Sequence, residues 1–112
     1  MRKSIWEDAK LRGVDFRAIG NEPGWYLELT KEDHILFVYD NGQQKVIMPE
    51  PKLEVHADDQ TAIYQSKTEA HELAVTILGE PCEDTMSGEL FESTVMVVLD
   101  GQSFHGCGRA LH

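Results

Sequence analysis

Apolar and polar residues alternate with a period of two along most of this chain after Gly13. In one such run, Trp25, Leu27 and Leu29 fall on one face, and the residues between them fall on the other. This alternation is typical of half-buried β-strands, whose side chains point to opposite faces in turn. The pattern predicts about eight short strands at regular spacing.

Short turn sequences separate these runs. Asp40-Asn41-Gly42 and Asp100-Gly101 are typical of tight β-hairpin turns, because Asn, Asp and Gly tolerate a left-handed backbone. Pro49 and Pro51 end the strand before them, since proline cannot donate a ladder hydrogen bond. Strands spaced in this way form an antiparallel barrel or a sandwich, and a closed barrel leaves no exposed strand edge. We therefore predict an all-β fold, a small antiparallel barrel with a short N-terminal helix.

Residues 4–12 have the pattern of that helix. Ser4 can cap its N-terminus, Glu7 completes a capping box, and Gly13 is a typical stop. The apolar stripe of the helix comprises Ile5, Trp6 and Ala9. A helix of this length is marginal alone, so we expect it either to dock or to fray.

The chain has 112 residues, of which 41% are hydrophobic, and this is enough for one domain with its own core. No internal repeat or low-complexity linker divides it. The sequence places one boundary near Gly13, between an N-terminal helical extension (residues 1–13) and a β-barrel domain (residues 14–112).

The formal net charge is −10 and the pI is about 4.8. Nucleic acid and anionic lipid both favour a basic protein surface, so neither is an expected partner. A basic protein would be attracted instead. No run approaches the roughly 20 apolar residues of a membrane-spanning helix. Met1-Arg2-Lys3 has no apolar run after it, so we identify no signal sequence, and the earlier removal of one stays open.

Cys82 and Cys107 are the two cysteines of the chain. Their spacing matches neither Cys-x-x-Cys nor a zinc pattern. The even count and the Gly- or Pro-rich surroundings favour a disulfide over two buried free thiols. A bridge would stabilise the fold by about 3 kcal/mol in the chain-entropy model, and it would imply an oxidising compartment.

Candidate catalytic chemistry is scarce. The five histidines have no metal-ligand spacing, and the acidic stretch around Asp84 lacks the order of a calcium loop. Ser87 lies in Met86-Ser87-Gly88, which is not a nucleophile elbow. We therefore expect a protein that is not an enzyme and has no cofactor and no metal site.

Two segments interrupt the strand pattern. The segment from Gly20 to Trp25 sets a tight turn before a large aromatic, so Trp25 either plugs one end of the barrel or contacts a ligand. The segment from Cys82 to Gly88 is a loop of small polar residues with one methionine, and rigidly held loops often carry function. Alternatively, this loop needs the disulfide only for its own order. The candidate binding residues are Trp25, Asp84, Met86, Ser87 and Gly88.

These segments resemble the motifs of a family of uncharacterised bacterial envelope proteins and lipoproteins. The resemblance covers residues 14–111 and rests on Gly-Asn-Glu-Pro-Gly-Trp at 20–25, on Cys-x-Asp-x-Met-Ser-Gly at 82–88 and on Gly-Cys-Gly at 106–108. The family often has Tyr-Pro where this chain has Phe91-Glu92. The resemblance implies export to the periplasm or to an anchored position at the outer membrane, and a disulfide, without an established activity.

A more distant similarity is to the membrane-bound inhibitors of c-type lysozyme. Those are small β-barrels with a disulfide, and a Ser-Gly loop enters the cleft of the enzyme. Ser87-Gly88 would correspond to that loop, although the lysine-bearing second loop of the family has no counterpart here. The acidic charge would suit a basic lysozyme.

The expected function is therefore that of an envelope binding module that meets a protein partner through residues 82–92. The alternative is a barrel that holds a small apolar ligand in its interior. Its lining would comprise Trp25, Phe37, Tyr64 and Phe104.

Overall fold

Antiparallel β-strands dominate the computed structural model, which describes residues 4–21 and 24–111. One helix precedes the strands, and a short 3-10 turn lies between β5 and β6. In chain order the elements are α1 (Ile5–Leu11), β1 (Phe16–Gly20), β2 (Trp25–Thr30), β3 (His34–Tyr39), β4 (Gln44–Pro49), β5 (Lys52–His56), η1 (Ala57–Asp59), β6 (Thr61–Lys67), β7 (Glu72–Leu78), β8 (Cys82–Glu83), β9 (Leu90–Phe91), β10 (Ser93–Leu99) and β11 (Gln102–Ala110).

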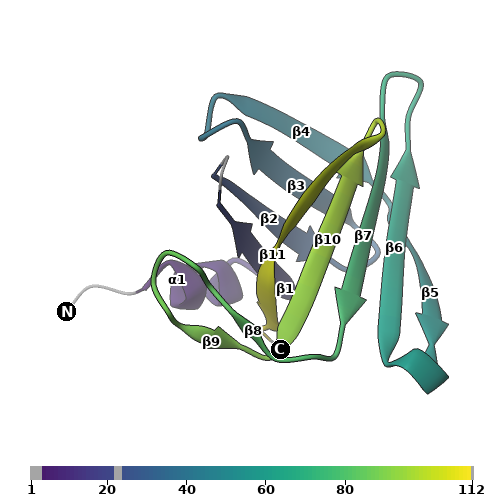
Figure 1. Cartoon of the computed structure of the whole chain (residues 1–112). Helices are drawn as coiled ribbons and strands as arrows, with labels where there is room; N and C mark the ends of the chain where they lie inside the picture. Colours follow the sequence, from purple (N-terminus) through teal and green to yellow (C-terminus); the bar gives the residue numbers. More distant parts are fainter. Residues whose placement is uncertain (1–3, 22–23, 112) are drawn as a thin grey trace.

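Nine of these strands form one sheet in the order β4-β3-β2-β1-β11-β10-β7-β6-β5. All of the pairings are antiparallel, and the sheet curls into a half-barrel (Figure 1). The predicted all-β antiparallel class is thus confirmed. Closure is incomplete, because β4 and β5 remain the two ends of the sheet. They approach where the Ser66 hydroxyl donates to the Pro49 carbonyl.

Both predicted hairpin turns are present. Asp40, Asn41 and Gly42 have φ of 55°, 55° and 90° between β3 and β4. Asp100 and Gly101 have φ of 50° and 86° between β10 and β11. This left-handed backbone matches the twist of antiparallel strands, which explains why the sequence uses Asp, Asn and Gly here.

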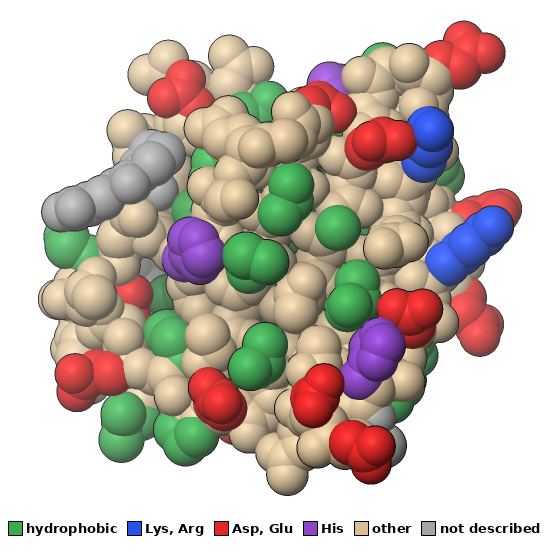
Figure 2. All heavy atoms as spheres, turned by 45° about the vertical axis from the view of Figure 1, so that its right-hand side comes forward, with side chains coloured by type: hydrophobic (Ala, Val, Ile, Leu, Met, Phe, Trp, Pro, Cys, Tyr) green, Lys and Arg blue, Asp and Glu red, His purple; other side chains and the backbone are tan. Residues whose placement is uncertain are grey.

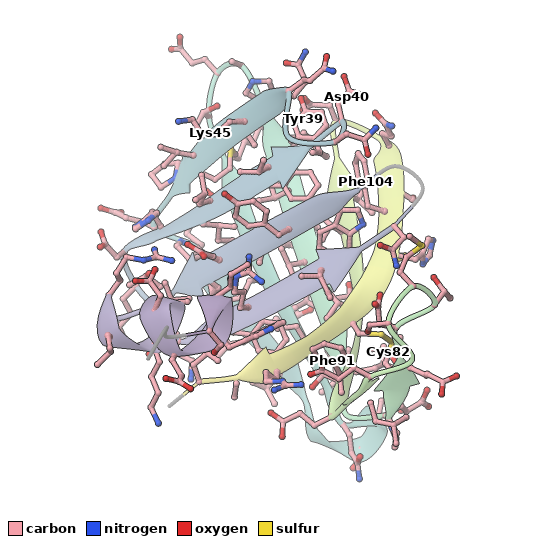
Figure 3. All side chains as sticks on the ribbon, turned by 90° about the vertical axis from the view of Figure 1, so that its left-hand side faces the viewer. Tyr39, Asp40, Lys45, Cys82, Phe91 and Phe104 are labelled. Carbon is pink, nitrogen blue, oxygen red and sulfur yellow. A yellow bond between two sulfur atoms is a disulfide. The ribbon has the colours of Figure 1, made fainter. Side chains whose placement is uncertain are left out.

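The concave face of the sheet holds the hydrophobic core. The alternation of each strand turns one set of side chains inward, and several of these are fully buried: Leu27, Phe37, Val75, Val95 and Val97. Aromatic rings fill the end of the core near the β3–β4 turn, where Tyr39 and Phe104 lie 5.7 Å apart (Figure 3). Burial of these side chains is the main contribution to folding.

Helix α1 lies against the outer, convex side of the sheet (Figure 1). Ser4 caps the helix as predicted, because its hydroxyl accepts a hydrogen bond from the Glu7 amide at 3.0 Å. Ala9 is fully buried and Trp6 is half-buried. Ile5, which the predicted apolar stripe included, is instead 63% exposed. The helix therefore docks through Trp6 and Ala9.

Residues 82–92, through which we expect a partner to bind, contain a small ladder. Strands β8 and β9 pair Cys82 with Phe91 and Glu83 with Leu90. Two residue pairs make a weak sheet alone, so other contacts must hold this segment.

The middle of the outer face of β6, β7 and β10 carries no charged side chain among the described residues. One row across these strands comprises Val98, Ala74 and Gln65, and the next comprises Met96, Thr76 and Ile63. Figure 2 shows hydrophobic and uncharged polar side chains in the middle of this face and charged ones around its margin. The acidic residues of the protein are thus unevenly distributed over its surface.

Candidate functional site

Three segments that lie far apart in the sequence meet at one corner of the half-barrel. Gly20 of β1 pairs with Gly106 of β11. Beside them, the Asn21 side-chain amide donates to Asp84 Oδ1 at 2.7 Å and to Thr85 Oγ1 at 3.2 Å. Residues 20–21 and the segments 82–88 and 106–108 therefore form one structural unit. Glu22 and Pro23 lie outside the described residues.

A disulfide joins this unit covalently. Cys82 and Cys107 are bonded, with Cα atoms 5.5 Å apart, so the predicted bridge is confirmed. It ties β8 to β11, and Cys82 and Phe91 lie beside that strand in Figure 3. The alternative of two free thiols is thereby overturned.

Asp84 organises the loop that follows the bridge, residues 84–89, which we name the Met86 loop. Asp84 is only 6% exposed, and its Oδ2 accepts from the Ser87 amide at 3.0 Å and from the Ser87 hydroxyl at 2.8 Å. Backbone hydrogen bonds add to these: Gly88 donates to the Asp84 carbonyl, and Asp84 donates to the Glu89 carbonyl. The loop thus has a defined conformation.

The hydrogen bonds to Asp84 also set its ionisation. Burial alone would raise the pKa of this carboxyl, but the donors from Ser87 and Asn21 outweigh it and hold the pKa below its ordinary value. Asp84 is therefore a carboxylate at neutral pH. In this form its two oxygens accept from the Asn21 side-chain amide and from the Ser87 amide and hydroxyl.

The tip of the Met86 loop is exposed and apolar. Met86 is 75% exposed and Leu90, just after the loop, is 69% exposed. Ser87 and Gly88 are also exposed. Gly88 has φ of +73°, a conformation that glycine adopts without strain, and no atom lies within 4 Å of the position of a Cβ. The loop therefore presents a large apolar side chain on a backbone that is already ordered.

A stack of cations and aromatic rings fixes the other end of the segment to α1 and the sheet. Arg109 lies 4.5 Å from the Phe91 ring centre and 4.8 Å from that of Trp6. The Arg17 guanidinium lies 4.9 Å from the ring centre of the same Trp6 and 4.8 Å from that of Tyr26. We name these five residues the cation–aromatic stack. Each such contact contributes about 0.5–2 kcal/mol, more where water is excluded.

An ion-pair cluster lies beside the stack on the outer face. Glu28 is 5% exposed and accepts two hydrogen bonds of 3.0 Å from Arg12 and one of 3.2 Å from Arg17. Burial raises the pKa of Glu28, but the two guanidinium groups lower it by more. Glu28 and Arg17 are buried on this outer face, whereas Arg12, directly after α1, is half-exposed.

Trp25 belongs to the core and not to the exposed tip. It is 5% exposed and packs 5.7 Å from Phe37. Its ring covers Gly20 and Gly106, where an added Cβ would lie 2.0 Å from Trp25 Nε1 and 1.9 Å from the Ile19 carbonyl oxygen respectively. The five predicted binding residues therefore divide into one core residue and four residues of the Met86 loop.

Some residues of this corner were not singled out by the sequence. Asn21, Arg17 and Arg109 each connect two segments. Asn21 lies within the 20–25 motif, but the sequence does not indicate such a role for any of the three. Strand alternation does place Arg17 and Glu28 on the outer face. The alternation does not predict that helix α1 covers these two residues.

No family model matches this chain, and neither does any curated protein or solved structure. Over the described ranges, no group of three or more His, Cys, Asp or Glu side chains is placed to hold a metal ion. The one helix found there, α1, is too short to cross a membrane. Function must therefore be inferred from the geometry of the Met86 loop and its surroundings.

Proposed function

We propose that this protein is a non-enzymatic binding module of the bacterial cell envelope, periplasmic or anchored to the outer membrane, and that its Met86 loop meets a basic protein partner such as a c-type lysozyme. The observation that carries this proposal is the 75% exposure of Met86 on a loop held by a disulfide and by Asp84. A side chain with this exposure does not contribute to the packing of the monomer.

Order in the free loop favours binding. Association normally costs the ordering of loops and side chains, and a loop that is already in its bound conformation avoids much of that cost. Methionine is unbranched and polarizable, so it adapts to the shape of an apolar pocket. Met86 at the tip is thus suited to act as the apolar anchor of an interface.

Charge around the tip favours a basic partner. Residues 80–92 contain no Lys or Arg and five acidic residues, of which Asp84 is buried and Glu89 pairs with Arg109. The other three are exposed: Glu80, Glu83 and Glu92. Opposite charge accelerates encounter and aligns the two surfaces, while the apolar centre provides the contact. An acidic margin around an apolar tip is complementary to a cleft with basic margins.

The disulfide supports an extracytoplasmic location. Such bonds persist in oxidising compartments, among them the bacterial periplasm. The resemblance of the three motif segments to envelope proteins agrees with this location, and the similarity of Ser87-Gly88 to the loop of lysozyme inhibitors indicates the class of partner.

Isothermal titration calorimetry with c-type lysozyme tests the proposal, together with a turbidity assay of bacterial lysis. We expect binding and inhibition by the unaltered protein, and a loss of affinity of roughly tenfold or more in Met86→Ser. Leu11→Ser is the matched control, because Leu11 is similarly exposed, at 67%, but lies on α1. Absence of binding heat, or equal affinity in both variants, would overturn the proposal. The same two assays with a g-type lysozyme test whether the partner is a c-type lysozyme.

The alternative of a ligand inside the barrel has less support. Its four expected lining residues are between 0% and 6% exposed and belong to the packed core. Phe37 lies 5.0 Å from Phe104 and 5.7 Å from Trp25, so these rings occupy the space a ligand would need. Their packing favours a site on the outside of the half-barrel.

A further inference from the structure

A groove of about 540 Å³ lies on the outer face of the sheet, between α1 and strands β1 to β3. Figure 3 views the molecule from the side on which α1 crosses these strands. The side chains that line the groove are largely apolar: Ile5, Trp6, Ile19, Tyr26 and Val38, with Arg17 among them. We name it the α1 groove, and its described lining includes no residue of the Met86 loop.

Arg17 is the one cation among the described lining residues of this groove. It is 6% exposed, and its guanidinium lies between the rings of Trp6 and Tyr26. Its Nε donates to Glu28, but neither of its terminal Nη groups has a hydrogen-bond acceptor among the described residues. A nearly buried guanidinium with two free donor groups therefore belongs to the lining of an apolar groove.

Glu28 does not supply the missing acceptors. Both of its carboxylate oxygens accept from Arg12 in a bidentate pair, and one of them also accepts from Arg17 Nε. In addition, no side-chain nitrogen of a described residue is both fully enclosed and without a partner. The Arg17 Nη groups are consequently still accessible. The accessible space beside Arg17 is the α1 groove, which it lines together with other residues.

We infer that the α1 groove binds a small monocarboxylic acid with an apolar body, whose carboxylate pairs with the Nη groups of Arg17. The planar fork of a guanidinium matches the two oxygens of a carboxylate, and such charge-assisted pairs are stronger where water is excluded. Water is largely excluded at Arg17, which is 6% exposed and has the rings of Trp6 and Tyr26 4.9 Å and 4.8 Å away. The groove volume lies in the range of known small-molecule sites.

The walls of the groove select the body of the ligand. Along the sheet, Ile19, Tyr26 and Val38 lie in one row next to the row of Arg17. Neighbouring rows on one face are separated by roughly 7 Å, since two residues of a strand span that distance. A medium-chain aliphatic or arylalkyl acid anchored at Arg17 would cover this row. The exposed side chain of Ile5 forms the wall on the side of the helix.

Calorimetric titration of the whole protein with octanoate tests this inference, with 1-octanol and octylamine as probes of the same body without the carboxylate. We expect octanoate to bind and to change the tryptophan fluorescence, since Trp6 and Trp25 both line the groove. Both other probes should bind roughly tenfold more weakly or worse. Equal binding of octanol, or no binding of octanoate, would overturn the inference.

Two pairs of variants locate the site. Arg17→Met should weaken octanoate binding roughly tenfold or more, whereas Arg109→Met should not, because Arg109 also contacts Trp6 but is not among the lining residues. If Arg17→Met does not fold, Ile5→Glu decides, since Ile5 is exposed and tolerates the change. Ile5→Glu should weaken the binding of octanoate. Leu11→Glu, on the same helix but outside the lining, should leave it unchanged. Unchanged affinity in Ile5→Glu would contradict the site.

Discussion

At the scale of the residue, Asp84 shows how one buried carboxylate sets the shape of a loop. It accepts three hydrogen bonds from Asn21 and Ser87, and these bonds connect β1, the disulfide segment and the loop tip. An unpaired carboxylate at this depth would be costly, so the donors are required for its burial. The sequence identified Asp84 and Ser87 as candidates but not Asn21, because a partner 63 residues away leaves no local pattern.

The ionisation of Asp84 predicts a pH dependence of stability. Its folded pKa is below the ordinary value of 3.8, so its contribution is complete above that value and is lost as the pH falls through the folded pKa. The pKa values of Glu28 and Asp100 are also lowered. We expect the free energy of unfolding in urea to fall below about pH 4, with a smaller fall in Asp84→Asn. An identical fall in both proteins would contradict the role of Asp84.

A side chain at Gly106 should lower stability through steric overlap and not through an unfavourable backbone conformation. A Cβ there would lie 1.9 Å from the Ile19 carbonyl oxygen and 2.8 Å from the Trp25 ring. Gly106→Ala should lower the free energy of unfolding by about 3 kcal/mol, because backbone cannot move aside as a flexible side chain can. The control is Gly101→Ala, where φ is +86° and space is open, with an expected loss of about 1 kcal/mol. Equal losses in a urea titration would refute the close approach.

At the scale of the element, α1 depends on the cation–aromatic stack. Seven residues do not form a stable helix in water alone, so its order comes from the contacts of Trp6 with two guanidinium groups and from buried Ala9. The capping residue and the limits of the helix were predictable, because Ser4 and Gly13 act locally. The exposure of Ile5 was not, because it depends on where Arg17 and Arg109 place the helix.

Trp6→Ala should therefore release α1 from the sheet. We expect a loss of about 2 kcal/mol in the free energy of unfolding, from lost ring burial and two cation–aromatic contacts. Faster amide exchange in residues 5–11 should accompany it. Ile5→Ala, which removes a side chain that is 63% exposed, should change the free energy of unfolding by less than about 0.5 kcal/mol. Comparable losses in the two variants would argue against docking through Trp6.

At the scale of the whole molecule, the half-barrel combines a well-predicted framework with edges that the sequence did not reveal. Alternation and the two hairpin turns predicted the antiparallel sheet, because both are local signals. Closure is a property of the two ends of the sheet, and no local pattern reports it. Strand β5 is exposed at every residue, and Lys52 and Glu54 give this edge the charges that discourage pairing with another chain.

Amide hydrogen exchange of residues 84–89, measured in the oxidised and the reduced protein, tests the central claim most directly. The claim is that the Cys82–Cys107 bridge and Asp84 hold the Met86 loop in its binding conformation before any partner arrives. We predict slow exchange of the Ser87 and Gly88 amides in the oxidised protein and markedly faster exchange after reduction. Fast exchange of both amides in the oxidised protein, or no change on reduction, would contradict it.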